Sequence, residues 1–221
     1  MAIPKVIYQT YKDNRLPFIT HLFIWWGRIV NRDYRYEFFD DARVASFLKS
    51  EFEPRIYNAY EKLQIGAAKG DFFRYAVLLK HGGVYLDIDG AILRPLRFLI
   101  QDDDVALISK ESAHDFFAQW ALVFAKDHPF VHRALDLCVD NIENNRHPYH
   151  VHAMTGPTVF TEAVRSVLRE HPNTPYRLIG PDWERKRLRV MIPKHFLNRI
   201  MYFRNEHWGK EQKKKSVLKS K

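Results

Sequence analysis

The feature that most constrains the fold is the stretch 66–96, GAAKGDFFRYAVLLKHGGVYLDIDGAILRPL, where a helical pattern is followed at once by a strand pattern. Residues 68–81 carry a wide apolar face at helical spacing, which predicts a helix. Gly82 and Gly83 supply the backbone freedom that ends a helix and turns the chain. Residues 84–86 are a short apolar run typical of a buried central strand. This order of elements predicts an α/β domain.

Two aspartates, Asp87 and Asp89, follow the predicted strand. Because side chains alternate along a strand, we expect both carboxylates on one side and Ile88 on the other. Two close carboxylates repel each other unless a cation lies between them, and Mn²⁺ or Mg²⁺ accepts oxygen ligands while keeping positions for water and phosphate. We expect Gly90 to let a ligand approach the backbone. An isolated Asp-x-Asp triplet is more often a solvated turn, so the metal interpretation depends on the surrounding residues.

The surrounding residues resemble the signature of the DXD sugar-binding glycosyltransferases, and family 32 is the most similar group. That family includes an outer-chain α-1,6-mannosyltransferase and many enzymes of capsule and lipopolysaccharide synthesis. The residues that carry the resemblance are Ala68, Lys69, Asp71, Arg74 and Tyr75, the run 82–87 and Asp89, with weaker matches at 3–9, 155–157 and 207–208. The sequence departs from the family at Tyr8, where histidine is frequent, and at Gly70, where alanine or serine is frequent.

The resemblance implies a fold of GT-A type, which is a single nucleotide-sugar-binding sheet flanked by helices, over residues 1–208. It implies a nucleotide-diphosphate sugar as donor and Mn²⁺ or Mg²⁺ as cofactor. Asp89 is expected to be the direct metal ligand, Asp87 to bind the metal through water or to bind the ribose, and His207 to complete the metal site. A neutral imidazole with two carboxylates is a reasonable partial ligand set for either cation.

The same resemblance assigns further contacts to the donor. Asp71 is expected to hydrogen-bond sugar hydroxyls, and Arg74 to hold Asp71 together with the sugar or phosphate through charge-assisted bonds. With Asp87 and Asp89, these two residues form the predicted catalytic group. Trp208 is expected to cover the diphosphate.

Two other segments are candidates for donor binding. Tyr8, Gln9 and Thr10 lie at the carboxyl end of a predicted first strand, where α/β sheets bind nucleotides. A core strand with an exposed end explains these residues equally well. Gly156 precedes a helix predicted over residues 159–168, and free N–H groups at such a start can bind phosphate or a sugar oxygen. The alternative there is an ordinary capped helix.

The sequence thus predicts a metal-dependent glycosyltransferase that moves a hexose, such as mannose, glucose or galactose, to a glycan, lipid or protein acceptor, as in polysaccharide biosynthesis. Retention of anomeric configuration is implied by the family alone. One alternative is a sugar nucleotidyltransferase, which usually needs a glycine-rich phosphate loop, and residues 3–17 contain no glycine. Another is an inactive sugar- or lipid-binding module, which the intact acidic residues disfavour.

Charge and length bound the rest of the chain. Its 221 residues suit one domain. Residues 209–221 hold six lysines and one glutamate, which supplies much of the net charge of +9. We expect this tail to be flexible, dispensable for chemistry and able to contact anionic lipid, and we expect no nucleic-acid partner because no binding motif accompanies the charge. The absence of a signal-peptide pattern predicts a cytoplasmic protein, peripheral at a membrane.

The remaining elements are predicted more briefly. In a helix over residues 21–30, Trp25 and Trp26 are expected to pack in the core or at its rim. Cys138 is expected to be a buried, inert thiol. Further strands are predicted at 5–9, 34–39, 91–94, 105–109 and 188–192, further helices at 42–49, 57–63 and 129–144, a helix cap at Asp40–Asp41, a solvated loop at 102–104, and a strand-poor last third.

Overall fold

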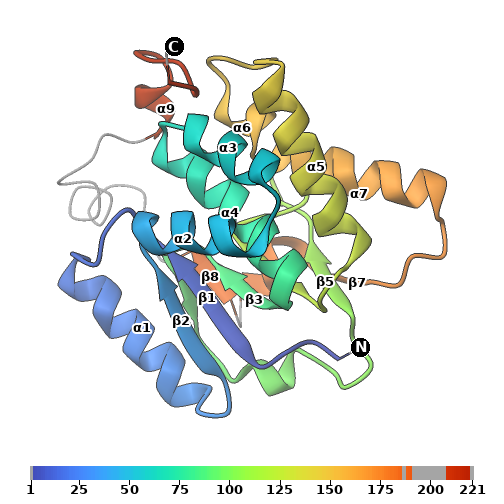
Figure 1. Ribbon diagram of the computed structural model, residues 1–221. Helices are drawn as coiled ribbons and strands as arrows, with labels where there is room; N and C mark the ends of the chain where they lie inside the picture. The colour runs from blue at the N-terminus through green and yellow to red at the C-terminus, as the bar shows by residue number, and fades with distance from the viewer. Residues whose placement is uncertain (1, 186–187, 191–207, 220–221) are drawn as a thin grey trace.

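The computed structural model describes residues 2–185, 188–190 and 208–219. Its centre is a six-stranded sheet in the order β2-β1-β3-β6-β5-β7 (Figure 1). Within it β1 is parallel to β2 and β3, while β6 is antiparallel to both β3 and β5, and β7 is parallel to β5. The strands are β1 Val6–Thr10, β2 Arg35–Phe39, β3 Gly83–Leu86, β5 Ala106–Ser109, β6 Ala121–Phe124 and β7 Arg177–Ile179, with β4 Gly90–Ile92 and β8 Leu188–Val190 paired apart.

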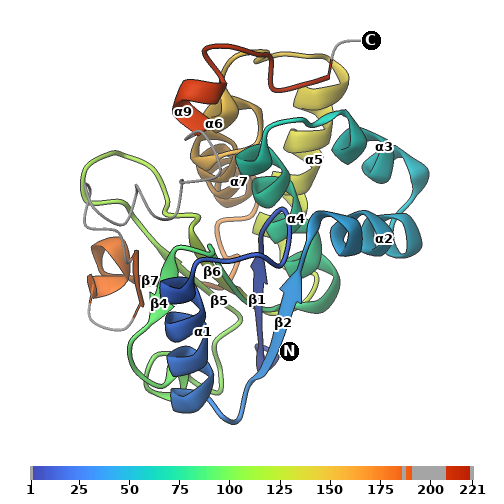
Figure 2. The same ribbon diagram turned by 90° about the vertical axis from the view of Figure 1, so that its left-hand side faces the viewer.

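Helices cover both faces of this sheet unequally. Helix α1, Phe18–Val30, lies on the opposite face from α2 and α4 (Figure 2). The other helices are α2 Asp41–Glu51, α3 Pro54–Lys62, α4 Gly66–His81, α5 Pro129–Glu143, α6 Val151–Met154, α7 Pro157–Glu170 and α9 Trp208–Glu211, with short 3-10 turns at Leu96–Phe98 and Pro181–Arg185. This arrangement confirms the predicted α/β sheet flanked by helices.

The strands alternate between two hydrophobic clusters. Val84 and Leu86 belong to the cluster on the α1 face, whereas Tyr85 between them belongs to the cluster under α4. The same period of two places Ile7 on the α1 side and Tyr8 on the α4 side. The side of the sheet on which Tyr85 lies is therefore the side that meets α4.

The turn from α4 into β3 confirms the predicted helix stop. Gly82 has φ +65° and its N–H donates to the Leu78 carbonyl at 2.9 Å. A Cβ atom at Gly82 would lie 2.6 Å from the backbone nitrogen of Lys126, and Gly83 has φ +110°. Neither conformation suits a residue with a side chain, so the glycines fix the angle at which α4 feeds the central strand.

The acidic run 102–104 behaves only partly as expected. Asp102 and Asp103 are exposed, but Asp104 is buried and forms an ion pair with Arg177 of β7. The guanidinium and a backbone N–H hold the pKa of Asp104 below its usual range, although its burial acts to raise it. The prediction missed β7 because no residue pattern signalled this pairing across the sheet.

The C-terminal segment differs from the predicted flexible tail. Val217 is fully buried, Leu218 is nearly so, and Leu218 forms a β-bridge with Leu63. The Gln64 side chain donates to the carbonyls of Ser216 and Leu218 at 3.0 and 2.7 Å. Lysine content suggested a solvated end, but two adjacent aliphatic side chains are sufficient to dock the segment against α3 and α4.

We therefore expect Val217→Ser to destabilise the fold, because it replaces a fully buried aliphatic side chain with a smaller, polar one. The expected loss is about 2 kcal/mol, or roughly 4–8 °C in melting temperature for a domain of this size. Thermal unfolding of Val217→Ser beside Lys213→Ser, which alters an exposed side chain of the same segment, checks this. Equal melting temperatures for both variants and the wild type would show that the segment contributes nothing.

The tryptophans of α1 also contradict the prediction. Trp25 is 61% exposed and Trp26 is 45% exposed, so neither packs in the core. The helix instead buries Thr20 and Gly27, and a Cβ at Gly27 would lie 3.8 Å from Ile92. Small residues set the contact with the sheet, which leaves the bulky ones outside. Among the described residues, no helix is both long and apolar enough to cross a membrane. Cys138 is buried, as predicted.

Candidate active site

A cavity of about 570 Å³ opens where β1 and β3 end. The carboxyl ends of neighbouring parallel strands are where open α/β sheets bind ligands. The lining comes from the ends of both strands, from α4, and from segments distant in sequence. These residues include Thr10, Tyr11, Lys12, Asp41, Tyr60, Lys69, Asp71, Arg74, Asp87, Ile88, Asp89, Gln119, Trp120, His152 and Trp208.

The two aspartates of the DXD motif lie in a turn rather than in an extended strand. Strand β3 ends at Leu86, and the Gly90 N–H donates to the Asp87 carbonyl at 2.8 Å. The strand alternation expected for Asp87, Ile88 and Asp89 therefore does not apply, and all three residues line the cavity. Gly90 serves the turn rather than a ligand, because a Cβ there would lie 2.7 Å from Leu86 and 3.0 Å from the Asp87 carbonyl oxygen.

Asp87 is held by two neighbours. Arg74 Nη2 lies 2.7 Å from Asp87 Oδ1, and the Tyr85 hydroxyl donates to the same oxygen at 2.9 Å. Tyr85 precedes Asp87 by two residues, so the strand period that faces Tyr85 toward α4 also carries its hydroxyl to the motif. The Arg74 guanidinium lies 4.8 Å from the Tyr85 ring centroid. The backbone of Asp87 is fixed as well, since its N–H donates to the Trp120 carbonyl at 2.7 Å.

Asp71 is the most enclosed carboxylate of the site. It is 4% exposed and accepts hydrogen bonds from Gln119 Nε2 at 2.8 Å and Thr155 Oγ1 at 2.9 Å. Arg74 Nη2 lies 3.1 Å from the same carboxylate. The Tyr75 hydroxyl donates to Gln119 Oε1 and so orients the amide. Three donors fix Asp71, which makes it the centre of a buried polar network joining α4 to the segments around Gln119 and Thr155.

The electrostatic balance of the site is negative. Asp71, Asp87 and Asp89 surround one buried guanidinium, that of Arg74. Burial, together with the charge of Asp87, raises the pKa of Asp71 to about 6 and that of Asp89 to about 7. Burial also raises the pKa of Asp87, against the opposing effect of Arg74. Among the described residues Asp89 forms no ion pair, so it is the carboxylate that a bound cation would stabilise most.

The acidic turn therefore fits a divalent cation by its chemistry. Within the described part of the chain, no group of three or more His, Cys, Asp or Glu side chains is placed to hold a metal ion. Asp87 and Asp89 supply two oxygen donors, which leaves positions for phosphate oxygens and water. His207, the third predicted ligand, lies outside the described residues.

Three of the predicted donor contacts are not part of the cavity lining. Tyr8 is 3% exposed and packs in the core against Phe39, with ring centroids 6.2 Å apart. Gln9 is buried, donates to the Asp87 carbonyl at 3.0 Å and accepts from the Tyr36 hydroxyl. Of the β1 residues predicted to bind donor, only Thr10 lines the cavity. Gln9 thus supports the acidic turn from behind.

Gly156 is the third residue that differs from the prediction. Its N–H donates to the carbonyls of Val151 and His152, both at 3.1 Å, so it is not available for a phosphate. A Cβ at Gly156 would lie 2.7 Å from His152 Cα, which explains the glycine by packing. The adjacent Thr155 contacts the site instead, because its hydroxyl donates to Asp71.

Trp208 lies at the cavity, as predicted, and closes a side that the sequence did not indicate. Its indole packs against the imidazole of His152, with ring centroids 4.8 Å apart and ring planes at 33°. From the sequence, no role was predicted for His152, Gln119 or Tyr60, and within 155–157 donor binding was assigned to Gly156 and not to Thr155. The Tyr60 hydroxyl is buried at the cavity without a hydrogen-bond partner in the described structure. No short motif marks these residues, because each reaches the site through tertiary packing.

Residues 26–113 match the family described as the glycosyltransferase sugar-binding region containing a DXD motif. This range includes Asp71, Arg74, Asp87 and Asp89, and it confirms the resemblance inferred from the sequence. The match ends before Gln119 and Thr155, so it covers the first half of the polar network alone.

Named relatives extend the similarity over more of the chain. It is 30% identical over 196 residues to an initiation-specific α-1,6-mannosyltransferase of Schizosaccharomyces pombe, covering 75% of this chain and 49% of that protein. It is 29% identical over 178 residues to inositol phosphoceramide mannosyltransferase 3 of the same yeast, covering 78% and 47%. An uncharacterized glycosyltransferase of Acanthamoeba polyphaga mimivirus is 48% identical over 60 residues, covering 27% and 24%. The chain thus spans less than half the length of these relatives.

Two solved structures share the fold. The PaToxG glycosyltransferase superimposes with a TM-score of 0.64 at 20% identity, covering 77% of this chain and 71% of that one. The UDP-bound glycosyltransferase domain of the YGT toxin gives a TM-score of 0.61 at 9% identity, covering 87% and 81%. These neighbours confirm the predicted GT-A type of fold.

Proposed function

Because residues 26–113 are a DXD sugar-binding region, we propose that this chain is a metal-dependent glycosyltransferase whose donor, a nucleotide-diphosphate sugar, binds in the cavity at the ends of β1 and β3. The observation that carries the proposal is Asp89, a half-buried carboxylate outside any described ion pair, beside an Asp87 that is already fixed by Arg74 and Tyr85. An anionic diphosphate requires a cation to approach such a site.

The residues of the site fall into two groups, those that hold the acidic turn and those that we propose bind the cation or the donor. Arg74 joins Asp71 to Asp87 and so keeps the acidic turn against α4. Asp89, Asp87 and His207 are the proposed ligands of Mn²⁺ or Mg²⁺. The bound cation supplies Lewis-acid charge that neutralises the departing nucleoside diphosphate. Thr10 lies on the cavity wall at the end of β1, where we place the nucleoside, and Trp208 covers the diphosphate.

The transferred sugar is proposed to be a hexose, with retention of configuration as in family 32. Mannose is the first sugar to test, because the yeast relatives are named mannosyltransferases. The acceptor is proposed to be a glycan, a glycolipid or a glycoprotein, and the location to be the cytoplasm with a peripheral membrane contact.

The direct experiment is a donor screen that measures release of nucleoside diphosphate from GDP-mannose, UDP-glucose and UDP-galactose with Mn²⁺. We expect release from at least one donor, and loss of release with EDTA. Asp102→Asn, which changes an exposed aspartate in a turn, should retain wild-type turnover and serves as the control for Asp89→Asn. Binding of nucleotide sugars without any release, with either cation and with glycan or lipid acceptors added, would instead identify an inactive sugar-binding module.

Trp208→Ala should raise the KM for donor while the metal requirement stays unchanged. An indole offers stacking and one N–H donor but no metal ligand, so about a two- to tenfold increase is expected from the loss of one aromatic contact. KM is measured at saturating Mn²⁺, and the apparent Mn²⁺ affinity at saturating donor. Trp26→Ala, on the outer surface of α1, should change neither value with a soluble acceptor. A weakened Mn²⁺ affinity in Trp208→Ala would place the indole in the metal site instead.

A further inference from the structure

Helix α1 is oriented with its bulky apolar side chains toward the outside. Phe18, Leu22 and Trp25 follow the spacing i, i+4, i+7 and therefore form one stripe along the helix. They are 77%, 41% and 61% exposed, and Trp26 beside the stripe is 45% exposed. A surface helix usually presents its polar side to water, so this apolar stripe requires an apolar environment outside the described fold.

A further exposed apolar side chain, from another segment, lies near the end of this helix. Asn31 Oδ1, just after α1, accepts a hydrogen bond from the Leu96 N–H at 2.7 Å, which places the 3-10 turn Leu96–Phe98 beside it. Phe98 is 59% exposed, and the Arg97 guanidinium lies 4.9 Å from its ring centroid. We define the α1 surface as Phe18, Leu22, Trp25, Trp26 and Phe98 with the arginines Arg28, Arg32 and Arg97.

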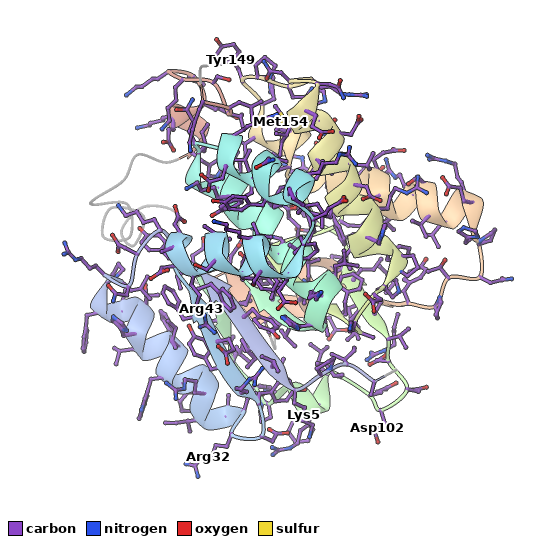
Figure 3. The ribbon with its side chains drawn as sticks, in the orientation of Figure 1. Lys5, Arg32, Arg43, Asp102, Tyr149 and Met154 are labelled. Atoms are coloured by element: carbon purple, nitrogen blue, oxygen red, sulfur yellow. The ribbon has the colours of Figure 1, made fainter. Side chains whose placement is uncertain are left out.

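The charges around the stripe are mostly positive. Residues 14–32 contain three arginines and no aspartate or glutamate. Arg28, Arg32 and Arg97 are all exposed, and Figure 3 shows Arg32 directed away from the molecule at the lower end of α1. The acidic residue that follows this segment, Asp33, is neutralised by an ion pair with Lys5 at 3.0 Å. The α1 surface is therefore apolar with a cationic border.

We propose that the α1 surface binds the face of an anionic lipid bilayer. Tryptophan and phenylalanine insert at the level of the lipid headgroups, and arginines at the border attract anionic lipid. A second copy of the chain would fit less well, since residues 14–32 offer no acidic group to pair with the arginines of a two-fold partner. The sequence had assigned membrane contact to the C-terminal tail, and the structure provides a surface with both required components.

The position of α1 gives the docking a consequence for the active site. Lys12 lines the cavity and Phe18 begins α1 six residues later, a separation that extended chain spans in about 20 Å. A bilayer bound at α1 would hold the cavity mouth close to its surface and would favour a lipid-linked acceptor. That last consequence depends on the proposed glycosyltransferase function, whereas the docking itself does not.

The test is co-sedimentation of the full chain with vesicles of phosphatidylcholine alone or with about 30% phosphatidylglycerol, an anionic fraction within the range where surface charge attracts basic segments. We expect binding to the anionic vesicles and weaker binding at high salt. Phe18→Ser with Trp25→Ser should lower the partition coefficient by about tenfold or more, since two exposed aromatics lose their insertion. Arg28→Gln with Arg32→Gln should lower it by about tenfold, and only on anionic vesicles.

The matched control is Tyr149→Ser, which removes an aromatic residue that is 57% exposed at the opposite end of the molecule (Figure 3). It should bind vesicles as the wild type does. Release of nucleoside diphosphate with a soluble acceptor should be unchanged in all these variants, which separates failure of the docking from failure of the proposed activity. The proposal is overturned if the wild type does not bind anionic vesicles, or if the aromatic variants bind them as well as the wild type does. It is also overturned if sedimentation shows a dimer that Trp25→Ser dissociates.

Discussion

Asp89→Asn is expected to lower turnover at least a hundredfold while the fold stays intact, a loss at or above the upper end for perturbed metal sites. The substitution keeps the shape of the side chain but removes the charge that we propose binds the cation. Asp87 alone does not compensate for this loss, because its Oδ1 is already engaged by Arg74 and Tyr85. Turnover with Mn²⁺ of wild type, Asp89→Asn and Asp102→Asn provides the measurement. Wild-type turnover in Asp89→Asn would remove the residue from the active site.

The same variant should be as stable as the metal-free wild type or more so. Burial and the neighbouring Asp87 raise the pKa of Asp89 to about 7 in the fold, above its value of about 4 in the unfolded chain. The folded wild type therefore binds more protons between these pH values, and its stability falls as pH rises from about 4 to about 7. The asparagine side chain of the variant does not titrate, so a gain of about 1 kcal/mol, or 2–4 °C in melting temperature, is expected at pH 8. The gain should disappear at pH 4.

Arg74→Met should have the largest effect on stability. Arg74 is 4% exposed and is the buried cation between Asp71 and Asp87, so its loss leaves two carboxylates without compensation. Breaking a buried ion pair in this way costs about 3–5 kcal/mol, which corresponds to roughly 10 °C or more in melting temperature. Turnover should be lost as well, because the acidic turn is no longer held against α4. Thermal unfolding and donor turnover measure the two effects.

The pH dependence of Arg74→Met distinguishes charge from packing. Without the guanidinium the pKa values of Asp71 and Asp87 rise further, so protonation relieves the strain and the deficit should be smaller at pH 5 than at pH 8. Asp71→Asn added to Arg74→Met should recover part of the lost stability. Arg133→Met, which breaks an ion pair of half-exposed side chains with Glu170, should change stability by less than about 1 kcal/mol. An equal deficit at both pH values would attribute the loss to packing alone.

The elements that the sequence predicted are those that depend on local residue patterns. The helix before Gly82 and the strand after it depend on neighbouring residues, and the structure places them as expected. Asp40 caps α2 through the Arg43 N–H at 2.8 Å, again a local signal. Of the predicted site residues, those that line one cavity are Asp71, Arg74, Asp87, Asp89, Thr10 and Trp208.

The errors concern contacts between distant segments. Gln119 and Thr155 meet Asp71 across 48 and 84 residues, and no periodicity encodes such pairs. Tyr8 and Gln9 were assigned to the donor because strand ends bind ligands, but both side chains are buried, Tyr8 in the core under α4 and Gln9 behind the acidic turn. The burial of Val217 and Leu218 was not predicted, because the lysines around them dominate the composition of the segment.

The measurement that tests the central claim most directly is Mn²⁺ binding followed by electron paramagnetic resonance, with nucleoside diphosphate present, for wild type and Asp89→Asn. Our account predicts that the diphosphate raises the Mn²⁺ affinity of the wild type and that Asp89→Asn lowers it by about tenfold or more, the range for a perturbed metal site. Asp102→Asn should match the wild type. Identical Mn²⁺ titrations for wild type and Asp89→Asn would contradict the proposal that the turn after β3 holds the cation.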